Sequence, residues 1–300
     1  MIKKVYVKVP ASIGNMGSGF DCAGLSLKFY NEFNVERTKK TEIVFSKPPE
    51  EISSEQAFSL FLKAFSITMK NLGLKTFPVK VRMENNIPFK RGLGSSATVI
   101  LAGVISGLLF AGRKISKEEI LRISLPIEGH IDNLAASLYG GFVIGRQDTL
   151  TVVSIMPPEN LRVVAFIPER GLSTKIARDI LPADVSLSDA VYTLSNTGFL
   201  CAAFFLKKLD LLKFGLEDRL HQPYRAKIIP HMKTLLVDRK PELAIGGCLS
   251  GAGPSVVFFC KSRNSKKVLL EIKTTVREEK LNGNVVLLYP GGKTSWKVVK

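Results

Sequence analysis

The sequence has no closely spaced pair of cysteines, and this limits the kinds of site that it can form. Its four cysteines, at positions 22, 201, 248 and 260, are scattered along 300 residues. The three histidines, His130, His221 and His231, do not show the His-Glu-x-x-His spacing of a zinc-binding helix. These absences argue against a zinc site and against a disulfide framework.

The N-terminal residues lack the pattern of a secretory signal peptide. Two lysines come early, and residues 5–9 then alternate like a strand. We therefore expect a cytoplasmic protein. The most apolar segment, residues 97–112, is shorter than the ~20 residues that a membrane span needs. We expect it to form a central helix that is buried on all sides.

Acidic residues are too few to balance the basic ones, and the formal net charge is +17. Clustered basic residues would indicate nucleic-acid binding, because they displace counterions from phosphates. Here the only short basic runs are at 37–40 and 261–267, and no aromatic residues alternate with them. The charge therefore favours a solvated basic surface, whose positive field would attract an anionic substrate.

The pattern of apolar residues divides the chain into two halves. Strands are predicted at 4–9, 42–45, 79–84, 141–144, 150–155, 161–167 and 285–289, and helices at 55–72 and 95–112. Another helix begins near Ser116, where Ser-Lys-Glu-Glu has the pattern of a capping box. The boundary is expected near residues 145–149, giving units of 1–148 and 149–300 that pack around a shared cleft.

Residues 88–97 form a glycine-rich turn that runs into the long apolar segment. Gly92 and Gly94 allow backbone conformations with positive φ, while Ser95 and Ser96 lie where a helix would begin with its amide groups unpaired. Such a helix start binds anions, and a serine in its first turn can help to ligate magnesium. The alternative is a plain glycine turn capped by serine. No Lys-Ser or Lys-Thr follows, so this is not a Walker motif.

Three further segments have unusual compositions. Residues 9–24 contain several glycines after a predicted strand, so Asn15 and Asp21 should lie on a loop. Residues 128–134 combine acidic, amide and histidine side chains, and residues 246–254 are again rich in glycine. Turns alone do not require this many such segments.

Together these segments resemble the motifs of the GHMP family of small-molecule kinases. Residues 88–97 match that family's second motif, Pro-x-x-x-Gly-Leu-Gly-Ser-Ser-Ala, and residues 249–254 match its third. Residues 10–21, 128–133, 140–142, 173–182 and 218–225 look like the blocks of the subgroup that phosphorylates the amino acid homoserine. The resemblance extends from about residue 5 to 260.

The resemblance implies an α+β fold of two domains, the first similar to a ribosomal-protein domain and the second ferredoxin-like. It also implies ATP and Mg²⁺ as cofactors, no nucleic-acid or membrane partner, and a homodimer. Ser96 and Glu128 would ligate the metal. ATP would lie on Pro88, Lys90, Arg91, Gly92, Leu93, Gly94, Ser95, Ser96 and Ala97, with Ser250, Gly251, Ala252 and Gly253 lining the site.

The substrate implied is L-homoserine, converted to O-phospho-L-homoserine for threonine synthesis. By resemblance, Arg178 and Arg225 would bind its carboxylate, where guanidinium groups can make paired hydrogen bonds. Asp21 would face its ammonium group. The remaining expected contacts are Asn15 and Asn133, which would lie near the hydroxyl as catalytic residues, and His130 and Thr174, which would line the site.

The sequence departs from the mevalonate-type members of the family, which are described with a lysine in the first motif and an aspartate base. Ile13 and Gly14 stand in that region here, and Asn133 is at the acidic position. Asp132 is adjacent, but neighbouring side chains point in different directions, so it is not assigned the role. We therefore expect catalysis by positioning, without a dedicated general base. A mevalonate- or sugar-type kinase and a non-catalytic RNA-binding module remain as alternatives.

Overall fold

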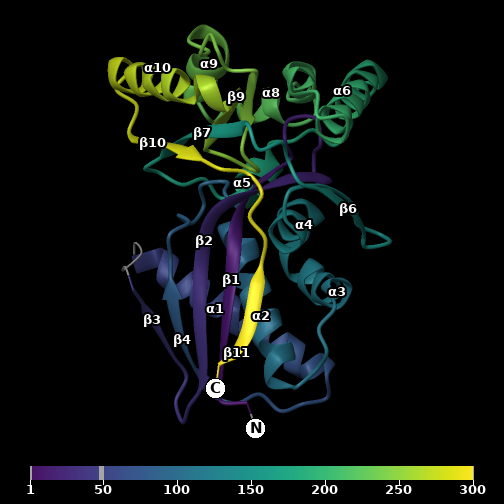
Figure 1. The fold of residues 1–300 in the computed structure, drawn as a ribbon, viewed down its shortest axis with the longest axis vertical. Coiled ribbons are helices and arrows are strands. Elements are labelled where there is room, and N and C mark those ends of the chain that lie inside the picture. The colour runs from purple at the N-terminus through teal and green to yellow at the C-terminus, as the bar shows by residue number, and fades with distance from the viewer. Residues whose placement is uncertain (1, 47–50, 300) are drawn as a thin grey trace.

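A twisted antiparallel-rich sheet with helices on one face forms one half of the molecule, and a smaller sheet with its own helices forms the other (Figure 1). The computed structural model describes residues 2–46 and 51–299. Within these residues, the first sheet has seven strands and the second has four. Strands and helices are thus segregated as expected for an α+β fold of two domains.

The first sheet is built around a long hairpin, β1 (Lys4–Gly14) and β2 (Ala23–Arg37). Its strands run in the order β11–β1–β2–β4–β3, and β5 pairs with both β2 and β6. Of the strand pairs described in this sheet, β3–β4 is parallel and the others are antiparallel. The other strands are β3 (Glu42–Phe45), β4 (Val79–Glu84), β5 (Phe142–Arg146), β6 (Thr151–Ile155) and β11 (Ser295–Val299).

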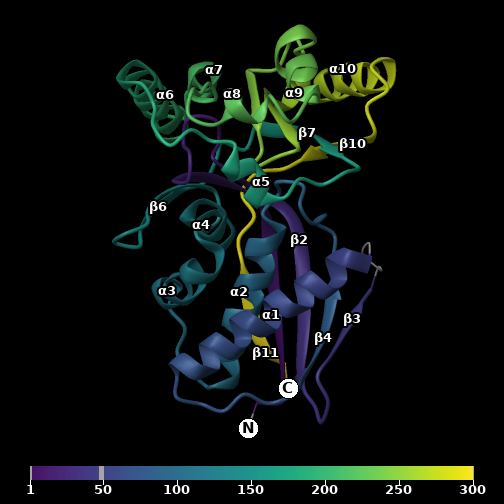
Figure 2. The ribbon, with the colours of Figure 1, turned by 180° about the vertical axis from the view of Figure 1, so that it is seen from behind.

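Helix α2 (Ser95–Phe110) packs between α1 (Glu51–Asn71) and the sheet, as the two opposite views show (Figures 1 and 2). Fourteen of its sixteen residues are buried, which confirms the predicted central helix. Gly103 allows α1 to pack closely, since a Cβ atom there would lie 2.7 Å from the carbonyl oxygen of Phe61. Helices α3 (Lys117–Glu128) and α4 (Ile131–Tyr139) complete this layer.

The second sheet has the strand order β10–β7–β9–β8, with antiparallel pairing throughout. Its β-α-β-β-α-β chain order matches the expected ferredoxin-like arrangement. The strands are β7 (Leu161–Pro168), β8 (Gly246–Leu249), β9 (Val256–Lys261) and β10 (Gly283–Leu288). The helices are α5 (Thr174–Asp179), α6 (Leu187–Phe205), α7 (Leu212–Gly215), α8 (Gln222–Arg225), α9 (His231–Lys233) and α10 (Ser265–Glu278), with short helical turns at Leu209–Leu211, Thr234–Asp238 and Ser262–Asn264.

Segments from beyond residue 148 also enter the first sheet. Strand β6 pairs with β5, although the expected boundary at residues 145–149 lies between them. The chain returns at its C-terminal end, where β11 pairs with β1. Residues 151–155 and 295–299 are therefore built into the first sheet, and the two halves share strands as well as a cleft.

Local signals agree with the structure where they are strong. Ser116 caps α3 by accepting a hydrogen bond from the amide of Glu119. The expected strands all occur, to within a few residues, whereas the fifteen residues of β2 and the whole of α4 were not predicted. Among the described residues, no helix is both long and apolar enough to cross a membrane.

A buried asparagine of β2 fixes the segment that leads into the glycine-rich turn. The side-chain oxygen of Asn31 accepts hydrogen bonds from the amides of Asn86 and Ile87, at 2.9 and 3.0 Å. Its nitrogen donates to the hydroxyl of Thr98 in α2. The start of the turn is thus tied both to the sheet and to the helix that follows it.

Candidate active site

The turn at residues 88–97 ends at the N-terminus of α2, and its backbone is left-handed at three positions. Lys90, Gly92 and Gly94 have φ angles of 55°, 73° and 70°. Within the described chain, no side chain caps this helix. The serine hydroxyls are used elsewhere, because Ser95 donates to the carbonyl of Ile87 and Ser96 donates to Glu128. The geometry therefore differs from a serine-capped turn, and the first amides of α2 are left for another acceptor.

The third glycine-rich segment lies directly against this turn. The hydroxyl of Ser250 donates to the carbonyl oxygen of Gly92 at 2.6 Å, and a Cβ atom at Gly92 would overlap the backbone of Ser250. Arg91 supports the turn from the other side through hydrogen bonds to the carbonyl oxygens of Phe89, Pro168 and Glu169. The guanidinium of Arg91 thus holds the turn in place.

The loop after β1 joins the same cluster. Asn15 and Asp21 both have positive φ angles, of 65° and 55°. The side-chain nitrogen of Asn15 donates to the carbonyl of Gly251 at 2.9 Å, and its oxygen accepts from the amide of Asp21 at 3.0 Å. Both ends of the Asn15 amide group are therefore engaged in holding the loop against the third segment.

One cleft brings together most of the residues singled out from the sequence. Pro88, Leu93, Ala97 and Ser250 do not line it; the side chains of Leu93 and Ala97 are buried in the core. Asp132 and Leu172 line it without having been assigned. The predicted residues that do line it are Asn15, Asp21, Lys90, Arg91, Gly92, Gly94, Ser95, Ser96, Glu128, His130, Asn133, Thr174, Arg178, Arg225, Gly251, Ala252 and Gly253.

Helix α5 carries two of these side chains into the cleft, one turn apart. Thr174 begins the helix and Arg178 follows four residues later, so both lie on the same face. Arg178 makes a two-pronged ion pair with Asp21, with distances of 3.0 and 2.7 Å. Its Nε atom is buried and has no hydrogen-bond partner among the residues that the structure describes. The pair therefore places one anion and one cation side by side, and the Nε–H group of Arg178 is left to donate to a ligand.

The second arginine is buried at the end of α8. Arg225 is only 1% exposed, and it donates to the carbonyl oxygens of Ala177 and Gly251. Burial and the nearby Arg178 lower its pKa to about 10, so it is still charged at neutral pH. The ring of Phe20 lies 5.6 and 5.7 Å from Arg225 and Arg178. The two cations are thus held near each other across an aromatic face.

His221 supports Arg225 in its neutral form, a role that the sequence did not indicate. Arg225 donates to Nδ1 of His221 at 3.1 Å, so Nε2 carries the proton and donates to the carbonyl of Gly17 at 2.8 Å. Burial lowers the pKa of His221 to about 4, although the nearby Asp218 carboxylate opposes this. The 3.4 Å contact between His221 and Asp218 is therefore not an ion pair at neutral pH.

Helices α3 and α4 supply the acidic side of the cleft. Oε2 of Glu128 accepts from the Ser96 hydroxyl at 2.7 Å, and burial raises the pKa of this carboxyl group. Burial also lowers the pKa of His130. Asp132 is fully buried, accepts from the amide of Asn15 at 3.1 Å, and has a pKa raised to about 6 by burial and by Asp21. A hydroxyl beside a carboxylate is a pair of hard oxygen ligands suited to Mg²⁺, which takes few protein ligands besides phosphates.

A metal held by protein side chains alone is not indicated. In residues 2–46 and 51–299, no group of three or more histidines, cysteines or acidic residues is arranged to hold an ion.

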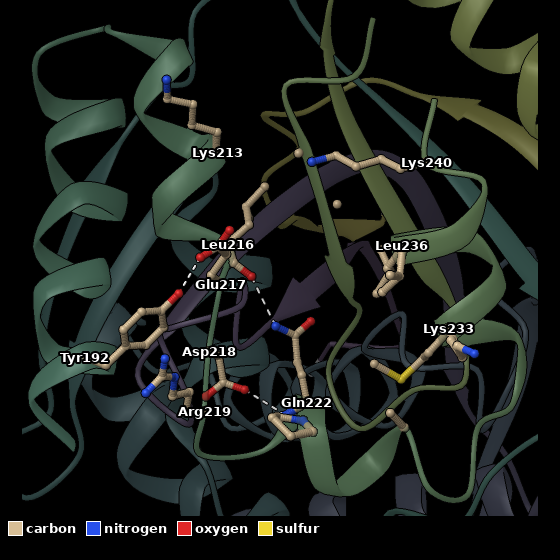
Figure 3. Close-up of a pocket in the computed structure, with 16 residues that line it drawn as sticks. Tyr192, Lys213, Leu216, Glu217, Asp218, Arg219, Gln222, Lys233, Leu236 and Lys240 are labelled. Atoms are coloured by element: carbon tan, nitrogen blue, oxygen red, sulfur yellow. Dashed lines mark hydrogen bonds between the residues drawn. The ribbon is translucent and has the colours of Figure 1, made fainter. Parts of the chain in front are cut away.

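A second cavity, of about 520 Å³, lies outside this cleft (Figure 3). None of the residues assigned to the site from the sequence lines it, although Asp218, Arg219, Gln222 and Pro223 of the block at 218–225 do. It lies between α6, α8 and the Thr234–Asp238 turn. Gln222 lines this cavity, and its side chain donates to the carbonyl of Leu216 and accepts from the amide of Leu249. The cavity is lined partly by apolar side chains such as Leu236 and partly by Lys213, Lys233 and Lys240.

Comparison with known proteins agrees with this geometry. Residues 59–141 match the GHMP kinases N terminal domain, and residues 203–277 match the GHMP kinases C terminal domain. The chain is 36% identical to a homoserine kinase of Carboxydothermus hydrogenoformans, over 95% of this chain and 94% of that protein. It is also 36% identical to one of Caldanaerobacter subterraneus, over 93% and 90%.

Solved structures show the same relationship. A homoserine kinase of Cytophaga hutchinsonii superposes with a TM-score of 0.81 at 26% identity, covering 99% of this chain and 98% of that one. A mevalonate kinase of Methanococcus jannaschii, at 15% identity and a TM-score of 0.66, shares the fold. The chain belongs to the GHMP kinase family. Its similar full-length relatives within that family are homoserine kinases, and the resemblance inferred from the motifs is confirmed.

The neutral state of His221 predicts a pH dependence of folding. Because its pKa is about 4 in the folded protein and near 6.5 when unfolded, the unfolded state binds more protons in this window. Stability from this group is therefore present above pH 6.5 and is lost as the pH falls towards 4. Between pH 7 and pH 5, the free energy of unfolding should therefore fall by about 1–2 kcal/mol less for His221→Gln than for the wild type.

Urea unfolding at both pH values measures this difference. Asp132 titrates in the same range with the opposite sign, because its raised pKa makes the folded state bind more protons. It is present in both proteins, so its contribution cancels in the comparison. Equal losses in the two proteins would contradict a neutral His221.

Proposed function

We propose that this protein transfers the γ-phosphoryl group of ATP to the side-chain hydroxyl of L-homoserine, forming O-phospho-L-homoserine and ADP. The observation that carries the proposal is one cleft lined by the turn at the start of α2, by the Asp21–Arg178 pair and by Arg225. The homoserine kinases that match nearly the full chain support the choice of acceptor. We further propose that it acts in the cytoplasm as a homodimer; its free cysteines Cys22, Cys201, Cys248 and Cys260 suit a reducing compartment.

ATP is proposed to place its phosphates on the turn at residues 90–96. The unpaired amides at the start of α2 and the positive end of its dipole favour bound phosphate. Because α2 is buried along almost its whole length, these amides are held in a fixed position and direction, so they are preorganised to bind phosphate. Mg²⁺, which screens phosphate charge when bound, is proposed to be held by Ser96 and Glu128.

Homoserine is proposed to bind opposite the turn. Its carboxylate would meet Arg225 and the unpartnered Nε of Arg178, since planar guanidinium groups suit carboxylates. Its ammonium group would face Asp21. Both side chains of the Asp21–Arg178 pair are about one third exposed, so the pair can exchange its internal contact for contacts with a zwitterion that enters the cleft. Sugars and isoprenoid alcohols have no such pair of charges, so this arrangement favours an amino acid.

The transfer is proposed to need no dedicated general base. Asn133 cannot accept a proton as a carboxylate would, and its side-chain oxygen already accepts from the hydroxyl of Ser12 at 2.9 Å. The cleft instead holds the hydroxyl in line with the γ-phosphate. A loose transition state needs little early deprotonation of the nucleophile, so positioning supplies much of the rate.

A coupled assay of ADP release tests the proposed function. The full chain is given MgATP and then, in separate reactions, L-homoserine, L-threonine, L-serine, mevalonate or galactose. We expect turnover that depends on homoserine. Turnover with mevalonate or galactose alone would place the protein with other GHMP kinases, and salt-sensitive RNA binding without ATP turnover would indicate a binding module.

Ser96→Ala tests the metal and phosphate site. Losing the hydroxyl beside Glu128 should lower magnesium-dependent turnover by about 10- to 1000-fold, as the loss of one electrostatic stabiliser does elsewhere. Ser95→Ala is the matched control, because the hydroxyl of Ser95 points away to the carbonyl of Ile87. Steady-state rates for Ser96→Ala that stay close to those of the wild type would remove Ser96 from the reaction.

Arg225→Gln tests the carboxylate site. Removing a charged partner should raise the KM for homoserine by about 10- to 100-fold and leave the KM for ATP nearly unchanged. Arg219→Gln is the control, since Arg219 belongs to the same segment but is half exposed and pairs with Asp189. Equal changes in both KM values for Arg225→Gln would contradict the assignment.

Asp132→Asn tests the absence of a general base. Asp132 lines the cleft with a pKa raised to about 6, which makes it the carboxylate best placed to act as one. The asparagine oxygen can still accept from the amide of Asn15, so the loop should keep its shape. We expect kcat to stay within about tenfold of the wild type. Loss of turnover with homoserine binding intact, measured by calorimetry, would show that Asp132 takes the proton.

A further inference from the structure

The second cavity, between α6, α8 and the Thr234–Asp238 turn, takes no part in the proposed reaction. Its volume of about 520 Å³ is within the range of roughly 300–1,000 Å³ that small-molecule sites occupy. It lies between two clusters of core residues, since Leu216 belongs to one cluster and Met232 to the other. Both side chains are buried, and half-buried Leu236 adds an apolar wall (Figure 3). The inner surface is therefore suited to burying the apolar body of a small molecule.

Positive charge surrounds the opening of this cavity. Lys240 extends across it, and Lys213 and Lys233 stand at two other edges (Figure 3). None of these three lysines pairs with a carboxylate among residues 2–46 and 51–299. Their charges are therefore left for an anion from solution.

The acidic side chains that line the cavity already have partners. Asp218 accepts hydrogen bonds from the amides of His221 and Gln222, at 3.0 and 2.7 Å. The carboxylate of Glu217 accepts from the hydroxyl of Tyr192. Both carboxylates are thus held by the protein, and the opening as a whole favours an anion over a cation.

Helix α8 and the residues beside it contribute to the cavity and to the cleft. Gln222, Pro223 and Ala226 line the cavity, whereas Arg225 lines the cleft. Residues 222 and 226 are four positions apart and share a side of the helical turn, while adjacent residues point in different directions. A ligand in the cavity would therefore pack against the same turn of helix that holds Arg225 in the cleft.

The loop after β1 also packs on the wall of this cavity. A Cβ atom on Gly17 would lie 2.3 Å from the carbonyl oxygen of Leu216, so the two backbones touch. The carbonyl of Gly17 accepts a hydrogen bond from His221, and His221 in turn accepts one from Arg225. Contacts thus run without a break from the cavity wall to the proposed carboxylate site.

We propose that this cavity is a second ligand site, which takes a small carboxylate with an apolar body and strengthens homoserine binding in the cleft. The apolar wall would bury the body, and Lys240 would meet the carboxylate. One ammonium group across the opening matches one anionic group rather than a polyphosphate. The coupling is positive because both ligands pack on α8 in the position that the structure shows, so each stabilises the turn that the other needs. This coupling rests on the proposed function, whereas occupation of the cavity does not.

Titration calorimetry of the full chain with octanoate tests the cavity. We expect saturable binding of one octanoate per chain. Hexanoate should bind about tenfold more weakly, because it has two fewer methylene groups to bury. Equal affinities for the two carboxylates would indicate contact with surface lysines alone and would overturn the proposal.

Two variants locate the site. Lys240→Glu reverses the charge at the opening and should raise the Kd for octanoate at least fivefold. Leu236→Trp should raise it at least tenfold by filling the cavity, and folding is not at risk because the half-buried side chain can extend into open space. Lys63→Glu makes the same charge change at an exposed position on α1 of the first domain and should leave the Kd unchanged. Absence of octanoate binding to the wild type, or binding that survives both cavity variants, would refute the site.

Titration of octanoate in the presence of saturating L-homoserine, without ATP, tests the coupling. The Kd for octanoate should fall about fivefold or more, and octanoate should lower the Kd for homoserine by the same factor. A higher Kd for octanoate would place its carboxylate on Arg225 in the cleft, and an unchanged value would show that the two sites are independent; either result contradicts the proposal. A protein that binds octanoate as expected and does not bind homoserine would refute the proposed function and leave the cavity site standing.

Discussion

The backbones of Gly92 and Ser250 touch, and the arrangement of the cleft depends on this contact. No side chain fits at Gly92, and the Ser250 hydroxyl closes the contact with a hydrogen bond to its carbonyl oxygen. The loop after β1 is tied to the same place, because Gly251 donates to the carbonyl of Gly14 and accepts from Asn15. Segments far apart in the sequence thus contact each other through backbone atoms. Such contacts fix their relative positions more firmly than side-chain contacts would.

This rigidity determines what the cleft can do with charge. The amides at the start of α2 are held by a helix buried on nearly every side, and they keep their direction when no phosphate is bound. On the opposite side of the cleft, the charged groups are the Asp21–Arg178 ion pair and Arg225, which donates a hydrogen bond to neutral His221. Asp21, Arg178 and Arg225 all have hydrogen-bond partners within the protein. A zwitterion would replace internal contacts and add no net charge.

The sequence reveals the parts of this site that depend on local chemistry. Glycines at residues 92 and 94 and an apolar run behind them predict a turn and a buried helix, and both occur. The role of His221 could not be read in this way, because it follows from burial and from contacts with Gly17 and Arg225. Strand β2 was missed because its buried side includes the polar residues Ser26 and Asn31, which interrupt the alternation of apolar residues. The return of β11 to the first sheet is a long-range pairing that no local pattern carries. The resemblance to a family supplied the roles of the arginines, which spacing alone left undetermined.

Adjacent residues at the start of α4 meet instead of diverging. Successive residues of a helix are about 100° apart, so Asp132 and Asn133 are expected to point in different directions. In the structure Nδ2 of Asn133 donates to Oδ1 of Asp132 at 3.3 Å, and a Cβ atom on Gly14 would lie 2.2 Å from Oδ2 of Asp132 and 2.5 Å from Nδ2 of Asn133. The other oxygen of Asp132 accepts from Asn15, while the side-chain oxygen of Asn133 accepts from Ser12 and would lie 3.1 Å from a Cβ atom on Gly94. In the proposed reaction, a hydroxyl beside the turn would therefore meet an amide group that Ser12 and Asp132 hold in place, which would orient the nucleophile and leave its proton to the phosphate as the bond forms.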